Sequence, residues 1–153
     1  MTIDKPTFKF KTNLKKRIFA TLLDYGLYCL AFYVYLMYFG HKDEDGGYKV
    51  SGLLATPIFL FWFIYFIVIE AFYGSTLGHL GFGLKVQTLN RNDINLTQAL
   101  KRHVLDPLDI FLYGIPAIIA IRNSDKHQRI GDMWAQTIVV DTTDAEQYLD
   151  KQT

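Results

Sequence analysis

Cysteine is nearly absent from this sequence, since Cys29 is the one residue of its kind among 153. A single thiol excludes an intrachain disulfide and a metal cluster built on thiolates. Net charge is small as well, because 16 Lys and Arg nearly balance 15 Asp and Glu. This balance argues against a nucleic-acid-binding protein with a global positive field, and an aromatic content of 16 % argues against a disordered chain.

Signatures of catalysis and metal binding are also missing. The four histidines lie in separate segments without the spacing of zinc ligands, so we expect no metal site. No GxxxxGK[ST] loop occurs, and the lone Gly74-x-x-x-Gly78 favours a tight turn or a close helix contact over a phosphate site. Neither a Ser-His-Asp nor a Cys-His arrangement is recognisable. We therefore expect no enzyme and no cofactor.

Charge is missing from two long stretches. Asp24 is the one charged residue in 18–39, and none lies in 51–69. Each stretch reaches the length of about 20 apolar residues that spans a bilayer. The sequence therefore excludes a soluble globular protein and predicts transmembrane helices over 18–39 and 51–70. The turn-rich GHKDEDGGYKV connects them as a hairpin.

The N-terminal segment 1–17 is basic, with six Lys and Arg against one acid. No small-x-small cleavage pattern follows the first apolar stretch, so we predict a retained signal anchor. The positive-inside rule places this N-terminus in the cytoplasm.

The next segment, 71–103, is predicted to be a cytoplasmic loop with an amphipathic helix. Its glycine-rich start, YGSTLGHLGFGLKV, indicates a membrane-skimming turn or short helix. LKVQTL and INLT, joined by NRND, predict a small β-hairpin, and Thr97 is the expected N-cap of the helix TQALKRHVLD. That helix should end near Asp106 because the residue before Pro107 avoids helical dihedrals.

The third apolar segment, 104–121, is short and is interrupted by Gly114 and Pro116. Basic residues follow it at the start of the tail 122–153, which favours a re-entrant or broken helix over a third span, although a three-span topology stays open. In the tail, QTIVVD is a predicted strand that can join the hairpin. We thus expect an all-α membrane protein with two transmembrane helices, a third broken or re-entrant helix and a small cytoplasmic β element, in one domain over 1–153.

Arg17 and Asp24 lie seven residues apart, which places both side chains on one helix face. Arg17 can reach the headgroups, but an ionised Asp24 inside the bilayer costs about 2.5–3.5 kcal/mol unless it is paired or protonated. Asp24 is therefore either a proton- or cation-binding carboxylate or a structural carboxylate bonded to a neighbouring helix.

Three further acidic residues lie at the edges of the apolar segments. Glu70 ends the second span, where an ion pair with Arg17 or the N-terminal lysines is expected to fix helix register. Asp106 and Asp109 precede the broken segment and either bind a hard cation through oxygen or are interfacial charges at a helix start.

Four fragments together resemble the RDD family of small membrane proteins: RIFATLLDYGLY, EAFYGSTLGHLGFGLKV, ALKRHVLDPLD and QRIGDMWAQTIVVD. Arg17 and Asp24 match the family's eponymous arginine and first aspartate, and Asp132 is the best match for the second aspartate. His79 stands where the family usually has lysine, and Gln136 replaces a usual glycine. The resemblance implies a multi-pass protein of the bacterial cytoplasmic (inner) membrane and, by a role proposed for the family, transport.

Two functions compete. The first is a small transporter, such as a cation/proton exchanger, in which Asp24 alternates between protonated and cation-bound forms while Arg17 tunes its pKa. Asp106, Asp109 and Asp132 are further candidate ion-binding residues. Two or three helices cannot enclose a pathway, so this function requires a homo-oligomer. The second is a non-transporting scaffold or accessory subunit that binds a partner membrane protein, with Arg17, Asp24 and Glu70 locking the helices together.

Overall fold

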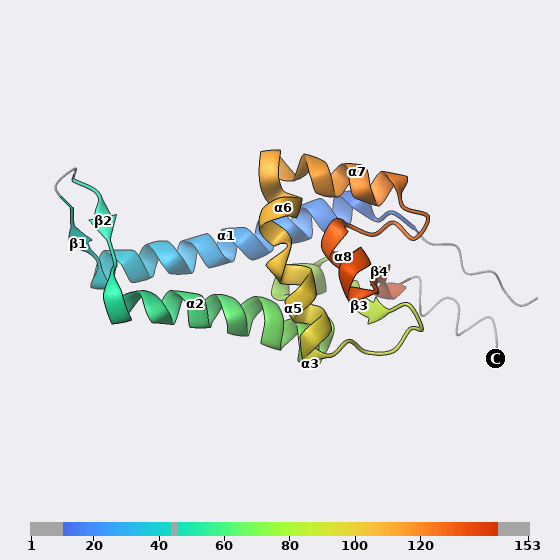
Figure 1. The fold of residues 1–153 in the computed structure, drawn as a ribbon, viewed down its shortest axis with the longest axis horizontal. Helices are drawn as coiled ribbons and strands as arrows, with labels where there is room; N and C mark the ends of the chain where they lie inside the picture. The colour runs from blue at the N-terminus through green and yellow to red at the C-terminus, as the bar shows by residue number, and fades with distance from the viewer. Residues whose placement is uncertain (1–10, 44–45, 144–153) are drawn as a thin grey trace, which may run out of the picture.

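Two long helices lie side by side and form a hairpin in the computed structural model, which describes residues 11–43 and 46–143 (Figure 1). The first helix, α1, spans Leu14–Phe39, so it begins one turn earlier than expected and includes Arg17. The second consists of η1 (Gly52–Ala55), α2 (Thr56–Trp62), η2 (Phe63–Val68) and α3 (Ile69–Tyr73). Between them, the short strands β1 (His41–Lys42) and β2 (Tyr48–Lys49) pair antiparallel.

Both helices of this hairpin are long and apolar enough to cross a membrane, and they are the two candidate spans among the described residues. Only 11 % of the most apolar stretch of Leu14–Phe39 is buried within the chain, and only 17 % of the most apolar stretch of Gly52–Tyr73 is buried. Helices that are apolar and yet uncovered by protein need another apolar environment, which lipid supplies. The two predicted transmembrane segments thus coincide with the two candidate spans.

The second helix is irregular in its middle as well as at its ends. Pro57 lies in its first turns, where its missing N–H leaves no hydrogen bond unmade. The segment Phe63–Val68 winds as a π-helix, a form that usually marks a functional position. Gly74 ends the helix with a φ of 69°, a left-handed conformation that glycine adopts without steric cost.

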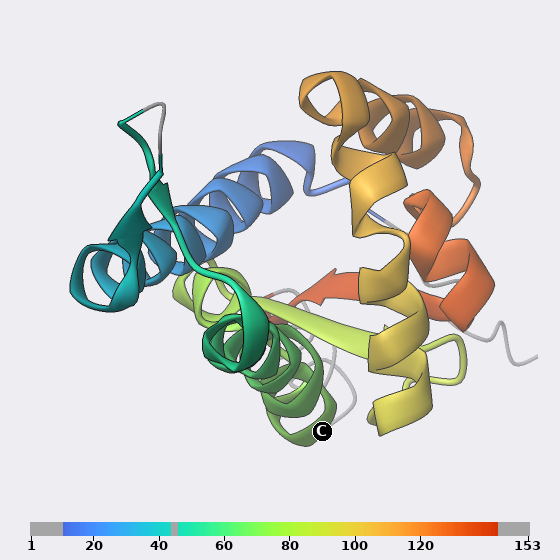
Figure 2. The same ribbon diagram turned by 60° about the vertical axis from the view of Figure 1, so that its left-hand side comes forward.

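The remaining elements gather at the end of the hairpin opposite β1 and β2, and we call residues 77–141 the head (Figures 1 and 2). Its elements are α4 (Leu77–Gly81), β3 (Leu84–Thr88), α5 (Leu96–Val104), α6 (Asp106–Ile110), η3 (Phe111–Gly114), α7 (Ile115–Asn123), α8 (Ile130–Ala135) and β4 (Thr137–Asp141). The predicted short helix in the glycine-rich segment is α4.

The β element differs from the expected hairpin. β3 pairs antiparallel with β4, with Val86 opposite Val139, so the predicted strand QTIVVD is confirmed as a partner of LKVQTL. INLT is not a strand, because Asn95 within it begins α5: its side chain accepts from the backbone N–H of Gln98, and the Gln98 side chain accepts from the backbone N–H of Asn95. Thr97, the expected N-cap, already lies inside α5.

The third apolar segment is broken, as predicted. Three short pieces, α6, η3 and α7, follow one another, and Gly114 turns the chain into α7 with a φ of 82°. Both ends of the segment return to the head: Asp106 at its start pairs with Arg129, and His127 just after it accepts a hydrogen bond from Arg17 at the start of α1. The two ends of the broken segment are therefore held by ion-pair and hydrogen-bond contacts near the start of α1 and α8.

The core joins the hairpin to the head. Ala20 of α1 and Phe66 and Ile67 of η2 are almost fully buried with Leu84 and Val86 of β3. Burying one large apolar side chain stabilises a fold by about 1.5–3 kcal/mol. The head is therefore fixed firmly against one end of both spans.

Candidate functional site

Asp132, in the first turn of α8, lies at the centre of a cluster of arginines and is fully buried. Its Oδ2 accepts from Arg17 Nη2 at 2.5 Å and from the backbone N–H of Arg129 at 3.1 Å. Its Oδ1 accepts from Arg102 Nη1 and from Arg129 Nε, the latter at 3.2 Å. One carboxylate thus links the start of α1, the last turn of α5 and the start of α8.

Glu70 continues the cluster on the second span. Its Oε1 accepts from Arg102 Nε at 2.8 Å, and its Oε2 lies 3.3 Å from His103 Nε2. The π-helical turn directly before α3 sets the rotation of the helix at this point and so directs Glu70 toward α5. Glu70 forms its ion pair with α5 rather than with the expected Arg17, which binds Asp132.

Asp106 and Asp109 both lie inside the cluster. Asp106 accepts from Tyr25 Oη at 2.6 Å, contacts His103 Nδ1 at 2.7 Å and pairs with Arg129 Nη1 at 2.8 Å. The two oxygens of Asp109 accept from the first backbone N–H groups of α8, those of Ile130 and Gly131, each at 3.2 Å. The oxygens that were candidates for binding a hard cation therefore already have cationic or N–H donors.

Opposite charges balance within this cluster. Burial alone would lower the pKa of His103, but the carboxylates of Glu70 and Asp106 outweigh it and raise the pKa to about 9, so His103 is protonated at neutral pH. Burial favours the neutral form of Asp132, yet Arg102 and Arg17 hold its pKa well below the ordinary range. Four cations then face four carboxylates. We call this set the ion-pair cluster: Arg17, Arg102, His103, Arg129, Glu70, Asp106, Asp109 and Asp132.

Asp24 lies apart from the ion-pair cluster and has its own set of donors. Oδ1 accepts from Tyr65 Oη at 2.9 Å and from the backbone N–H of Gly78 at 2.6 Å. Oδ2 accepts from Thr76 Oγ1 at 2.6 Å and contacts His79 Nδ1 at 3.0 Å. The carboxylate is almost fully buried, and every contact is a hydrogen bond that favours its charged form.

α4 and its N-cap Thr76 supply three of these four partners to Asp24, because α4 approaches α1 very closely at Gly78. A Cβ at this position would overlap the carbonyl oxygen of Ala20 and come within 2.6 Å of the Asp24 carboxyl carbon. Glycine is therefore required there, which confirms the close helix contact predicted for this residue. In the resulting geometry His79 is the basic side chain that faces Asp24.

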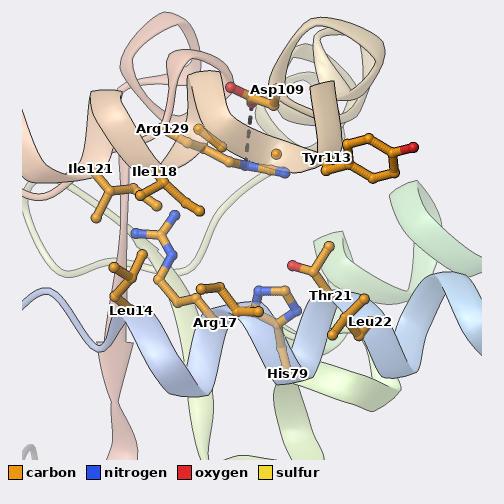
Figure 3. A pocket seen from close by; sticks show the side chains of 13 residues that line it. Leu14, Arg17, Thr21, Leu22, His79, Asp109, Tyr113, Ile118, Ile121 and Arg129 are labelled. Carbon is orange, nitrogen blue, oxygen red and sulfur yellow. Dashed lines mark ion pairs between the residues drawn. The ribbon is translucent and has the colours of Figure 1, made fainter. Parts of the chain in front are cut away.

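A cavity of about 310 Å³ separates the first turns of α1 from α7 (Figure 3). Leu14, Ile18 and Leu22 form one wall and Ala117, Ile118 and Ile121 the other. Arg17, Arg129, Asp109 and His79 line its polar part, so the cavity touches both the ion-pair cluster and the partner of Asp24.

The four predicted ion-binding aspartates thus separate into two places: Asp106, Asp109 and Asp132 meet in the ion-pair cluster, whereas Asp24 binds His79. Sequence reasoning missed Arg102, His103 and Arg129, since buried and exposed basic residues look alike in a polar segment. It singled out His79 as a departure from a family pattern but gave it no partner. Among the described residues, no group of three or more His, Cys, Asp or Glu side chains is placed to hold a metal ion.

Comparison with known proteins places the chain in a family. No curated protein and no solved structure matches it. The model of the RDD family matches residues 12–136, a region that contains both candidate spans, Asp24 and the whole ion-pair cluster. Because this match covers most of the 153 residues and the family is one of membrane proteins, the chain is a membrane protein that belongs to the RDD family.

Proposed function

We propose that this membrane protein is a small transporter that exchanges a monovalent cation for protons, with Asp24 as the residue that binds either. The observation that carries the proposal is the pairing of Asp24 with His79. A buried carboxylate within a candidate span joins an imidazole at 3.0 Å, and that imidazole borders a cavity. An ionisable group inside a membrane helix is by default a functional candidate.

The pair has the chemistry that proton exchange needs. Burial lowers the pKa of His79, and although its hydrogen bond to the Asp24 carboxylate opposes that effect, the lowered pKa favours loss of the imidazole proton. The hydroxyls of Tyr65 and Thr76 each contact one oxygen of Asp24, and such carboxylate and hydroxyl oxygens are ligands that suit a hard monovalent cation. In this mechanism His79 relays the proton between the cavity and Asp24. Arg17 lines the same cavity as His79, and its charge influences the proton on the imidazole.

The proposal also covers the orientation of the protein in the membrane, its oligomeric state and the role of the ion-pair cluster. We place the protein in the bacterial cytoplasmic membrane with residues 1–17 and the head on the cytoplasmic side. Because two spans cannot enclose a pathway, we propose a homo-oligomer with the conduit at an interface between copies. The ion-pair cluster then fixes the head, and Asp106, Asp109 and Asp132 act by keeping the site in shape. No enzymatic step is part of the proposal.

The test is proton movement in sealed proteoliposomes that carry a trapped pH dye, on addition of sodium, potassium or lithium. Cation-dependent proton flux is expected from the natural sequence and should be lost in Asp24→Asn, which keeps the shape of the side chain. The matched control is Asp93→Asn, whose side chain is 77 % exposed and which should leave flux unchanged. Absence of flux from the natural protein, or full flux from Asp24→Asn with intact protein, overturns the proposal.

The alternative is a non-transporting scaffold that binds another membrane protein. The observation in its favour is the number of donors on these carboxylates: Asp24 accepts from Thr76 and Gly78 and Asp109 accepts from the first N–H groups of α8, which suits a rigid framework. This alternative predicts that a heterologous membrane protein co-purifies in mild detergents and that Asp24→Asn fails to accumulate. A pure homo-oligomer whose Asp24→Asn form accumulates normally would argue against it.

A further inference from the structure

The cavity between α1 and α7 has features that proton exchange at Asp24 does not use. Its two walls are apolar, with Leu14, Ile18 and Leu22 on α1 facing Ala117 and Ile118 on α7. Arg17 and Arg129 also line it (Figure 3), and because their side chains are only 6 % and 12 % exposed they form its inner end. An apolar slot that ends in two cations has the polarity of an amphiphile with a negatively charged head.

The inner end presents positive charge although the ion-pair cluster as a whole is balanced. Arg17 and Arg129 line the cavity, whereas Asp106 and Asp132, which neutralise them, lie behind them and are not part of its lining. Asp109 does line the cavity, but both of its oxygens accept backbone N–H groups of α8. An incoming anion therefore meets guanidinium groups first, which suits a phosphate.

The outer end of the cavity is continuous with the surface that faces lipid. Ile18 and Leu22 line the cavity and are also 37 % and 63 % exposed, and Tyr113 at its rim is 99 % exposed. α1 has 26 residues and is therefore roughly 39 Å long, which exceeds the hydrocarbon thickness of about 30 Å. Its first turns, where the cavity lies, consequently reach the level of the phospholipid headgroups.

We propose that this cavity binds one anionic phospholipid, with the phosphate at Arg17 and Arg129 and the start of an acyl chain between α1 and α7. The lipid enters sideways from the bilayer through the opening beside Tyr113. Binding of this lipid does not depend on transport and is measured without it.

The experiment is native mass spectrometry of the full chain in detergent, titrated with phosphatidylglycerol or phosphatidylcholine. We expect phosphatidylglycerol to bind at one site about tenfold more tightly, as two arginines near a headgroup imply. Ala117→Phe, which fills the cavity from α7, should abolish this adduct. Ala120→Phe is the matched control, because Ala120 lies on the same helix but does not line the cavity.

Thermal unfolding of both variants in detergent shows whether they fold, and a third variant, Ile118→Trp, gives a second way to fill the cavity if Ala117→Phe does not fold. Glycerol phosphate, which has the head but no chains, should not displace the lipid. The proposal is overturned if folded cavity-filling variants keep the affinity of the natural protein, if phosphatidylcholine binds equally well, or if glycerol phosphate competes as strongly as the lipid.

Discussion

Asp132 joins three helices of the fold, because arginines at the start of α1, in α5 and at the start of α8 all contact its carboxylate. Asp132→Asn keeps the shape of the side chain but removes the charge, which leaves those arginines buried without compensation. Breaking a buried ion pair in this way costs about 3–5 kcal/mol. We expect a large loss of free energy of unfolding in detergent, measured by chemical denaturation.

Asp141→Asn is the matched control for Asp132→Asn. Asp141 pairs with Lys16, whose side chain is 43 % exposed, so water replaces the lost contact and the cost should stay below about 1 kcal/mol. Equal stability of the Asp132→Asn and natural proteins would show that the arginines find other partners.

His103 gives the stability of the protein a defined dependence on pH. Its pKa is raised from 6.5 to about 9 in the fold, chiefly by Glu70 and Asp106 against the effect of burial. A raised pKa means that this contribution to stability is complete below pH 6.5 and is lost as the pH rises through about 9. We expect the unfolding temperature in detergent to fall across this window.

His103→Gln isolates this effect because glutamine can donate a hydrogen bond but does not titrate. The variant should be less stable at low pH and should lose most of the slope between about pH 6.5 and pH 9. An unchanged slope would assign the pH dependence to other groups.

At the residue scale, sequence reasoning found acids more easily than bases. Asp24 stood out because it interrupts an apolar stretch, and Asp132 was found through the family resemblance. Arg102 and Arg129 lie in polar segments, where nothing local distinguishes a buried arginine from a solvated one. Arg102 pairs with Glu70, which is 32 residues away, and Arg129 pairs with the distant Asp106, and only the folded chain creates these contacts.

At the scale of elements, the contact between α4 and α1 is the most sensitive to volume. Gly78→Ala would push a methyl group against the Ala20 carbonyl and the Asp24 carboxylate, so α4 must move away and Asp24 loses donors. We expect about 1–3 kcal/mol of destabilisation, measured by unfolding in detergent.

Gly26→Ala is the matched control for this change. Gly26 lies on α1 with no atom within 4 Å of an added Cβ, and alanine is the better helix former. That variant should equal or exceed the natural protein in stability. If both alanine variants behave alike, the close approach of α4 does not limit stability.

The elements also show why some predictions from sequence were right and others wrong. Hydrophobic length predicted both candidate spans, and charge with Gly114 predicted the broken third segment. The hairpin of LKVQTL and INLT was wrong because the capping pair of Asn95 and Gln98 favours a helix start over a strand. The π-helical turn at Phe63–Val68 has no sequence signal, because it depends on packing of Phe66 and Glu70 against α5.

At the scale of the whole molecule, the head gathers at one end of the hairpin, which predicts the membrane topology. Arg17 donates to the carbonyl of His127 at 2.7 Å, and β3 pairs with β4. Because these contacts join residues on both sides of α7 to the start of α1, we expect all of them to lie on one side of the membrane. We therefore expect position 124 and position 43 to lie on opposite sides.

Single cysteines test this topology in a Cys29→Ser background. A membrane-impermeant maleimide added outside right-side-out vesicles should label Asp43→Cys. Ser124→Cys should react only when the reagent reaches the inner face. Labelling of both from the same face would mean that the third segment crosses the membrane. Detergent-solubilised protein, in which both positions should react, is the control for access.

The position of Asp132 has a consequence for biosynthesis. Asp132 lies 115 residues after Arg17 and 30 after Arg102 along the chain. At about 5–20 residues per second, the ribosome adds it on the order of ten seconds after Arg17. For that interval the insertion machinery can already act on both spans, but Arg17 at the start of the first span still lacks its counter-ion. Folding is therefore complete only when α8 of the head has been synthesised and Asp132 can pair with Arg17. A chain that stalls before α8 should be recognised as unfinished and degraded.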